Sequence, residues 1–163
     1  MNLSELEARV RRYAESHGVE VDLSKALGFG QDGRVWQTLN KTAIKAVERP
    51  RNYIAERDSY QRLLDADVST IDGLNVPRLV DFDDALQIIE MEIVKPPYLL
   101  DFGKAHLDSK PDFSEETMAE WEEHLVELFG DDMPRVKGVL RRLTAYGIYY
   151  YDAKPANIRL RPA

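Results

Sequence analysis

The apolar positions change their period along the chain, which predicts a strand-rich first part and a helical second part. Residues 4–16 carry apolar residues at helical spacing, and Ser4 and Glu7 form a capping box at their start, so an amphipathic helix is predicted there. Residues 19–47 are short runs of Val, Leu, Ile and Thr separated by glycine or asparagine, which predicts three antiparallel strands. Residues 50–65 return to a helical period behind a proline, and a second helix is predicted there.

The second half of the chain begins with a predicted hairpin. Residues 76–94 read as two further strands that turn at Asp83 and Asp84. Pro96 and Pro97 then end the strand pattern and mark a hinge. Beyond the hinge the apolar residues recur every three or four positions. Helical segments are therefore predicted at residues 98–107, 114–129 and 134–146.

Composition narrows the class of protein. The 163 residues are 44% hydrophobic and 31% charged, which is typical of one globular domain. A net charge of −7 has the wrong sign for a protein that neutralises phosphate backbones, so no nucleic-acid partner is expected. No apolar stretch reaches membrane-spanning length, and residues 1–12 lack the apolar segment of a signal peptide. The absence of cysteine fits a reducing compartment, so a cytoplasmic location is expected.

The acidic residues are concentrated in residues 108–132, where ten carboxylates face the single cation Lys110. Such a run favours a solvated helix face, with a surface for docking a partner as the alternative. The three histidines have no metal-ligand spacing and are interpreted as surface or helix-end residues: His17, His106 and His124.

A glycine motif in the first part is the first candidate for chemistry. Gly28, Gly30 and Gly33 have the spacing Gly-x-Gly-x-x-Gly, and the residues that follow resemble a strand rather than a helix. This context favours a strand-loop-strand flap whose backbone N–H groups can approach phosphates. A plain glycine hairpin is the alternative interpretation.

Lys45 is the second candidate. On a strand it shares a face with Ala43 and Val47, so its ammonium leaves an otherwise apolar side and needs an anionic partner if it is covered. Glu56 on the next helix is the natural partner, and the pair would keep the lysine charged in a cleft. The alternative is an edge-strand lysine that reaches solvent.

Residues 147–158 read GIYYYDAKPANI and resemble the catalytic loop of protein kinases, whose common form is GIIHRDLKPENI. The glycine flap, Ala-Ile-Lys at residues 43–45 and Asp-x-Lys-Pro-x-Asn at residues 152–157 occur in kinase order. The resemblance covers about residues 19–161.

The resemblance to protein kinases implies a nucleotide site for ATP in the first part of the chain. The glycine loop would cover the phosphates, and Lys45, paired with Glu56, would contact the alpha and beta phosphates. Met91 would be the gatekeeper residue. The implied adenine pocket consists of Val35, Ala43, Met91 and the backbone of Glu92 and Val94.

The resemblance also implies catalytic roles for the second motif. Asp152 would accept the proton of the substrate hydroxyl, and Lys154 would steady the gamma phosphate. Asn157 would hold a magnesium ion. The predicted cofactors are therefore ATP and magnesium.

The fold that the resemblance implies is α+β and protein-kinase-like, with a five-stranded antiparallel N-lobe sheet, a C-helix and a truncated helical C-lobe. It is expected as one minimal domain over residues 1–163. Within it we expect an N-terminal helix at 1–18, the N-lobe at 19–93, the hinge at 94–97 and the truncated C-lobe with the catalytic loop at 98–163.

The chain differs from the kinase pattern before and after its catalytic loop. Tyr150 and Tyr151 replace the usual His-Arg pair, so control through a phosphorylated activation loop is not expected. The sequence ends six residues after Asn157, before the position of the family's metal-binding Asp-Phe-Gly. Residues 101–103 spell Asp-Phe-Gly ahead of the loop, where the order favours a helix turn that packs Phe102 into the core.

These features predict an ATP-binding, kinase-like protein with atypical or weak phosphotransferase activity. The alternative is a pseudokinase or regulatory module that binds a nucleotide or a partner without catalysis. A second copy of the chain or a protein partner is expected to cover the apolar surface of the shortened C-lobe, and helix 4–16 is another candidate for that cover.

Overall fold

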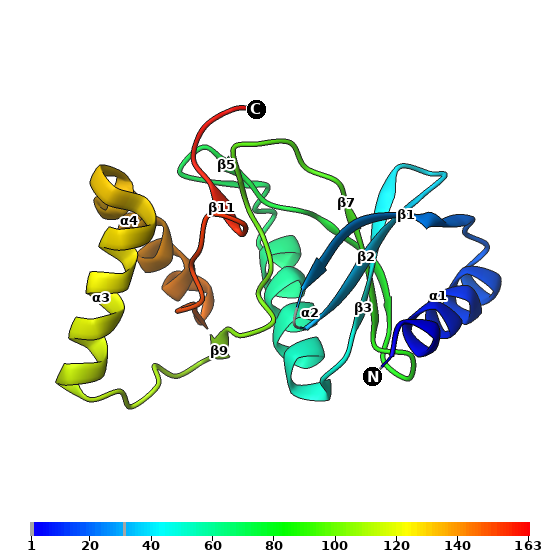
Figure 1. Ribbon diagram of the computed structural model, residues 1–163, viewed down its shortest axis with the longest axis horizontal. Coiled ribbons are helices and arrows are strands. Elements are labelled where there is room, and N and C mark those ends of the chain that lie inside the picture. Colours follow the sequence, from blue (N-terminus) through cyan, green and yellow to red (C-terminus); the bar gives the residue numbers. More distant parts are fainter. Residues whose placement is uncertain (1, 31) are drawn as a thin grey trace.

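The computed structural model describes residues 2–30 and 32–163. Its largest sheet has five antiparallel strands in the order β1-β2-β3-β7-β6, and stands in the right half of Figure 1. The α+β class and the five-stranded antiparallel sheet predicted from the sequence are thus confirmed. The strands are β1 (Val21–Gly30), β2 (Gly33–Thr38), β3 (Thr42–Val47), β6 (Leu79–Asp83) and β7 (Ile88–Glu92).

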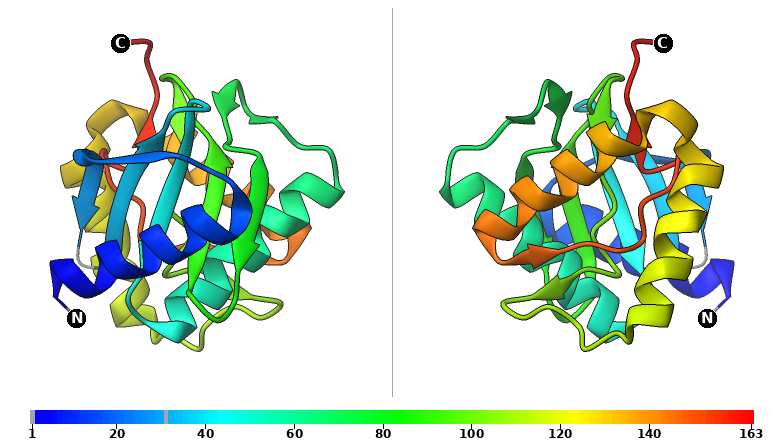
Figure 2. Two further views of the ribbon diagram at one scale, coloured as in Figure 1. Left: turned by 90° about the vertical axis from the view of Figure 1, so that its right-hand side faces the viewer. Right: turned by 90° about the vertical axis from the view of Figure 1, so that its left-hand side faces the viewer.

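Helix α1 (Leu3–His17) lies across the outer face of this sheet, as the left view of Figure 2 shows. Its buried side chains and those of the outer sheet face form one apolar cluster: Leu6, Val10, Tyr13, Trp36, Ile44, Ala46 and Ile88. Helix α1 therefore covers the sheet, and not the helical half of the chain.

The capping box of α1 differs from the prediction. Asn2 accepts the backbone N–H of Glu5 at 2.9 Å, and the Glu5 side chain accepts the N–H of Asn2 at 3.1 Å. Ser4 lies inside the first turn, where its hydroxyl donates to Asn2. The pairing of Ser4 with Glu7 was wrong, because asparagine is at least as good an N-cap as serine and the helix begins two residues earlier.

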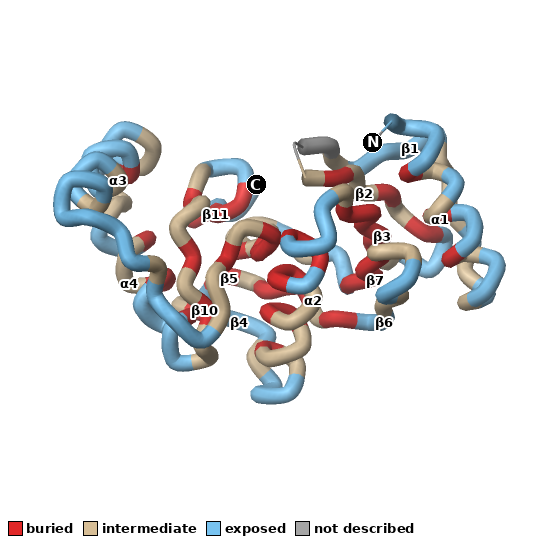
Figure 3. Tube along the Cα trace, turned by 90° about the horizontal axis from the view of Figure 1, so that it is seen from below, coloured by how far each residue is buried: buried red, intermediate tan, exposed pale blue. Residues whose placement is uncertain are grey.

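Helix α2 (Pro50–Asp65) covers the inner face of the sheet and lies between the sheet and the helical half of the chain (Figures 1 and 3). Two short strands follow it, β4 (Thr70–Ile71) and β5 (Leu74–Asn75), which the sequence pattern did not reveal. One apolar cluster joins the inner sheet face, α2 and the last third of the chain, from Ala43 and Val47 to Leu140 and Ile158.

The prediction of a helical segment at residues 98–107 was wrong. The segment contains two short strands, β8 (Tyr98–Leu99) and β9 (His106–Leu107). They pair with β11 (Ile158–Arg159) and β10 (Ile148–Tyr149), which flank the kinase-like motif. Because these partners lie far along the chain, the local apolar spacing carried no information about the pairing.

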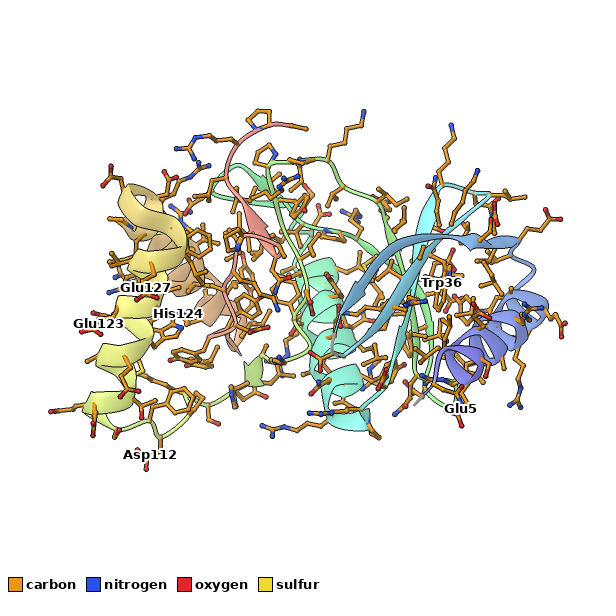
Figure 4. All side chains as sticks on the ribbon, viewed as in Figure 1. Glu5, Trp36, Asp112, Glu123, His124 and Glu127 are labelled. Atoms are coloured by element: carbon orange, nitrogen blue, oxygen red, sulfur yellow. The ribbon has the colours of Figure 1, made fainter. Side chains whose placement is uncertain are left out.

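The remaining helices are α3 (Glu115–Phe129) and α4 (Met133–Leu143), joined and followed by the single turns η1 (Gly130–Asp132) and η2 (Thr144–Tyr146). Helix α4 buries four apolar side chains, whereas α3 buries only Leu125 fully. The acidic side chains of α3 are exposed, among them Glu123 and Glu127 in Figure 4, so the prediction of a solvated face is confirmed. Among the described helices, none is both long and apolar enough to cross a membrane.

Candidate functional site

A pocket of about 460 Å³ lies between the inner sheet face, α2 and the segments at residues 98–104 and 154–157. Eleven of the residues that the sequence nominated line it: Gly28, Gly33, Val35, Ala43, Lys45, Glu56, Met91, Glu92, Val94, Lys154 and Asn157. Gly30 pairs with Gly33 at the end of the β1–β2 ladder. The pocket therefore brings residues from distant parts of the chain to one place, while their roles in binding stay predictions.

The pocket has an apolar end at the hinge side of the sheet. Ala43 and Met91 are opposite each other on β3 and β7, and both are nearly fully buried. Val35 and Leu27 line the same cavity from β2 and β1. A strand turns every second side chain to the same face, so Ala43 and Lys45 both look into the pocket while Ile44 packs behind it.

The glycine hairpin that roofs the pocket has one position that only glycine fits. A Cβ atom at Gly33 would collide with the carbonyl oxygen of Ala46 on β3. At Gly28, by contrast, a Cβ would meet no heavy atom of the described residues within 4 Å. The close approach of β2 to β3 therefore explains Gly33, and Gly28 leaves open space beside the pocket.

The polar end of the pocket is centred on Lys45. Its ammonium lies 2.7 Å from Oε2 and 3.0 Å from Oε1 of Glu56, and 3.2 Å from Oδ1 of Asp101. Lys45 and Glu56 are 7% and 1% exposed, so this ion pair is shielded from water. Helical spacing had placed Glu56 on the inward side of α2, and its predicted contact with Lys45 is present.

Lys45, Glu56 and Asp101 shift one another's pKa values. Burial opposes the charge on Lys45, but Glu56 and Asp101 outweigh it and hold the pKa of the ammonium above its ordinary value. Burial raises the pKa of Glu56 to about 7, against the opposing effect of Lys45 and with the help of Asp101. Burial also acts on Asp101, but Lys45 reverses its effect, so the pKa of Asp101 is lowered. The more deeply buried of the two carboxyls is thus the weaker acid.

Asp101 is the site residue that reasoning from the sequence missed. The motif order favoured a packing role for Asp-Phe-Gly at residues 101–103, as a helix turn, and Asp101 was not among the predicted site residues. The structure has no helix there, and the Asp101 backbone is left-handed, at φ 69°. This conformation is costly for a residue with a Cβ, although Asp tolerates it better than most, and it turns the carboxylate to Lys45.

Phe102 and Gly103 explain why Asp101 is held in this place. Phe102 is fully buried, as expected from the sequence, and its ring lies edge-on to Tyr60 of α2 and to Tyr150. Gly103 donates its backbone N–H to the Asp101 carboxylate. The sequence signal that could have identified Asp101 was the Asp-Phe-Gly motif at residues 101–103. Because β8 pairs with β11, this motif lies beside the kinase-like motif although it comes earlier in the chain.

Asn157 is buried, lines the same pocket as Asp101 and has a defined orientation. Its amide nitrogen donates to the Tyr150 hydroxyl at 2.9 Å and to the backbone carbonyl of Asp152 at 3.4 Å. Because a carbonyl can only accept, the amide oxygen must point the other way. The Asn157 carbonyl also accepts the N–H of Leu100, which ties the kinase-like motif to the residue before Asp101.

Asp152 and Lys154 lie at the edge of the site. Lys154 lines the pocket, and its ammonium is 3.8 Å from Oδ2 of Asp152. The side chain of Asp152 is 29% exposed and stands beside the pocket rather than among its lining residues. Asp152 is therefore partly open to solvent beside the pocket wall.

Comparison with known proteins gives a fold-level likeness only. No protein-family model and no curated protein matches the chain. The chain is similar to APH(2'')-IIa in its ternary complex with streptomycin and ATP, with 10% identity and a TM-score of 0.41 over 77% of this chain and 38% of that one. It is also similar to the aminoglycoside phosphotransferase APH(2'')-Ib bound to ADP, with 14% identity and a TM-score of 0.43 over 76% and 39% of the two chains.

The chain thus spans about two fifths of the length of these two structures. At such identities and scores the likeness assigns no residue a role.

Proposed function

We propose that the pocket binds ATP and that the chain is a kinase-like phosphotransferase. The observation that supports this most directly is the buried Lys45 ammonium, held by Glu56 and Asp101 in a pocket that is apolar at one end and carries lysine ammonium groups at the other. A nucleotide has the matching polarity, because its base is flat and weakly polar and its phosphates are anionic. Lys154 supplies a second cation at the phosphate end.

The adenine base would lie between the hinge and the glycine hairpin. The N–H of Glu92 already donates to the carbonyl of Arg78, so the contact proposed for Glu92 is through its carbonyl oxygen. Val94 follows β7 outside any strand, and its N–H is the proposed donor to the base. Val35 and Ala43 would cover the faces of the ring.

Magnesium is the proposed second cofactor, and the residues at the phosphate end fit it. A hard divalent cation prefers oxygen ligands, and Asp101 offers a carboxylate with a lowered pKa while Asn157 offers the amide oxygen that its hydrogen bonds leave over. Asp101 thereby supplies the carboxylate that the motif order had placed out of reach. When bound, the ion would neutralise charge on the phosphates.

In the proposed reaction an acceptor hydroxyl attacks the gamma phosphorus, a new P–O bond forms, and the bond to the ADP oxygen breaks. Asp152 takes the proton of the attacking hydroxyl. Lys45 holds the alpha and beta phosphates, and Lys154 stabilises charge on the transferred group. Glu56 keeps Lys45 in place. Positioning and electrostatics are the main demands of phosphoryl transfer, and these groups meet them.

ATP binding is tested by the melting temperature with and without ATP and magnesium. A ligand at a hundredfold its Kd stabilises the folded protein by about 2.7 kcal/mol, so a rise of several degrees is expected. Lys45→Ala should abolish the rise, whereas Lys110→Ala, at an exposed lysine outside the pocket, should keep it. A parent protein whose melting temperature ignores ATP would disprove the proposal.

Phosphoryl transfer is tested with gamma-labelled ATP, by following label in phosphate and in the chain itself. Asp152→Asn should lower the rate at least about a hundredfold, because it removes the general base. Asp112→Asn changes an exposed acidic residue remote from the pocket and should leave the rate unchanged (Figure 4). If both variants transfer label like the parent, the activity belongs to a contaminant.

A nucleotide-binding pseudokinase is the second candidate, since Asp152 stands outside the pocket lining. ATP binding without any label transfer would establish it.

A partner protein or a second copy of the chain is proposed for α3, which fully buries only Leu125 and leaves Val126 exposed. A cytoplasmic location is also part of the proposal, because a chain without cysteine that uses ATP suits that compartment.

A further inference from the structure

A second ion pair lies in the same pocket and has no role in the proposed reaction so far. Asp32, in the turn between β1 and β2, and Lys104, just after the Asp-Phe-Gly segment, both line the pocket. The Lys104 ammonium is 3.7 Å from Oδ2 of Asp32. Asp32 occupies a non-glycine position of the glycine motif, and Lys104 lies outside that motif and outside the kinase-like catalytic motif.

The two partners of this pair are held very differently. Asp32 is 14% exposed, and its Oδ1 accepts a 2.7 Å hydrogen bond from the amide of Asn52, a buried residue on α2. Lys104 is 37% exposed, and 3.7 Å is longer than the 2.7–2.9 Å of a charge-assisted hydrogen bond. Asp32 is therefore fixed by the fold, while the ammonium of Lys104 can move to a closer anion.

The backbone places Lys104 beside the cluster around Lys45. A Cβ at the preceding residue, Gly103, would lie 3.4 Å from Oε2 of Glu56 and 3.6 Å from Oδ1 of Asp101. From there the Lys104 side chain extends toward the turn of the glycine hairpin, where Asp32 lies. It thus stands between the proposed magnesium ligand and the roof of the pocket.

The polar end of the pocket therefore has three lysines, and each of them lies near at least one carboxylate. Lys45 faces Glu56 and Asp101, Lys154 faces Asp152, and Lys104 faces Asp32. Both carboxylates of the first lysine are within hydrogen-bond distance of its ammonium, whereas the other two lysines are 3.7 and 3.8 Å from theirs. Lys104 and Lys154 are held loosely by their carboxylates, so they have the most interaction energy to gain from a bound phosphate chain.

We infer that Lys104 binds the phosphates of the nucleotide and that Asp32 is the anion it exchanges for them. The inference rests on the proposed function, since it assumes that the pocket takes a nucleoside triphosphate. Asp32 stays bonded to Asn52 after the exchange, so its charge repels the phosphates and lowers affinity. Together the two residues select ligands by the number of phosphates: Lys104 favours ATP over adenosine, and Asp32 limits that preference.

The test measures the Kd of adenosine, ADP and ATP by calorimetry at fixed magnesium concentration. Lys104→Gln should weaken ATP binding about tenfold and leave adenosine unchanged, because one charge-assisted contact to phosphate is lost. Lys104→Arg should bind ATP like the parent. Asp32→Asn keeps a side-chain oxygen for Asn52 and should tighten ATP binding severalfold. Lys25→Gln, at an exposed lysine of β1 outside the pocket, is the control and should change nothing.

The result that overturns the inference is an ATP affinity unchanged in Lys104→Gln, or an equal loss for ATP and adenosine. That result leaves the proposed function intact, because the parent still binds ATP. A parent protein that binds none of the three ligands overturns the proposed function and the inference together. Melting curves of each variant without ligand establish that the substitutions have not unfolded the chain.

Discussion

Strand β3 sends alternate side chains into two different environments. Ile44 and Ala46 pack with Trp36 under α1, in a layer closed to water. Ala43 and Lys45 face the pocket on the other side. The outer face of the sheet has been sealed by a helix from the same chain, while the inner face keeps a cavity with buried charges.

Even the buried charges of the two faces differ in how they are satisfied. On the outer face, Glu90 of β7 accepts the hydroxyls of Tyr13 and Thr42, at 2.8 and 2.7 Å. Both of these donors are neutral hydroxyl groups, so within the described residues the Glu90 carboxylate is satisfied without a lysine partner. On the inner face, Lys45 holds two carboxylates and lies in a pocket. The comparison teaches that the outer face stabilises the sheet and that the inner face is arranged for a ligand.

The largest expected effect is on the outer face. Trp36→Ala removes a side chain that is 1% exposed between α1 and the sheet (Figure 4). The cavity should lower the free energy of unfolding by about 3–5 kcal/mol. Urea denaturation measures this loss, and ATP affinity measured on the folded fraction should stay the same. A loss of affinity at full folding would show that the two faces are not independent.

The next prediction compares the stability effects of substituting two glycines of the β1–β2 hairpin, Gly33 and Gly28. Gly33→Ala forces a Cβ against the carbonyl of Ala46, so β2 must shift and the free energy of unfolding should fall by about 1–3 kcal/mol. Gly28→Ala places its Cβ in open space and should leave stability unchanged. Chemical denaturation of both variants tests the difference; equal stabilities would contradict the close approach of β2 and β3.

A smaller effect is expected from the hydrogen bond of the outer face. Tyr13→Phe removes one donor to the buried Glu90, which keeps Thr42, and should cost about 1.5 kcal/mol of unfolding free energy. Tyr146→Phe is the matched control, because its hydroxyl makes no hydrogen bond to the part of the chain described in the structure. The melting temperature of Tyr13→Phe should be lower than that of Tyr146→Phe. Identical melting curves would mean that the Tyr13–Glu90 hydrogen bond contributes nothing to stability.

The last effect is a pH dependence on the inner face. Glu56 has a pKa of about 7 in the folded protein, above its ordinary value of 4.5, so the folded chain binds more protons than the unfolded chain between these values. Stability from this group is therefore present at the acidic end and is lost as the pH rises through about 7. Asp101, whose pKa is lowered, acts in the opposite sense and below this window.

Glu56→Gln cannot titrate and should remove this slope. Urea midpoints at about pH 5, 6, 7 and 8 measure it in the parent and the variant. The advantage of the parent over the variant should shrink as the pH rises. An advantage that stays constant or grows toward pH 8 would show that Glu56 ionises at least as readily in the folded protein as in the unfolded chain.

The sequence predicted the elements whose signals are local. Period-two alternation put Lys45 on a covered face, helical spacing put Glu56 toward it, and a run of glycines marked the hairpin that ends at Gly33. The five strands of the sheet were predicted from short runs of Val, Leu, Ile and Thr and from the turn residues between them. Residues 98–107 could not be assigned in this way, because their strands are two residues long and their partners lie after α4.

Asp101 shows most clearly what only the tertiary structure decided. The identity of the motif was visible in the sequence, but its position ahead of the catalytic segment argued against a place in the site. The antiparallel pairing of β8 with β11 brings the two segments side by side regardless of their order, and the burial of Phe102 fixes the turn. Local periodicity reports which face a side chain takes, whereas contacts between distant segments are set by packing of the whole core.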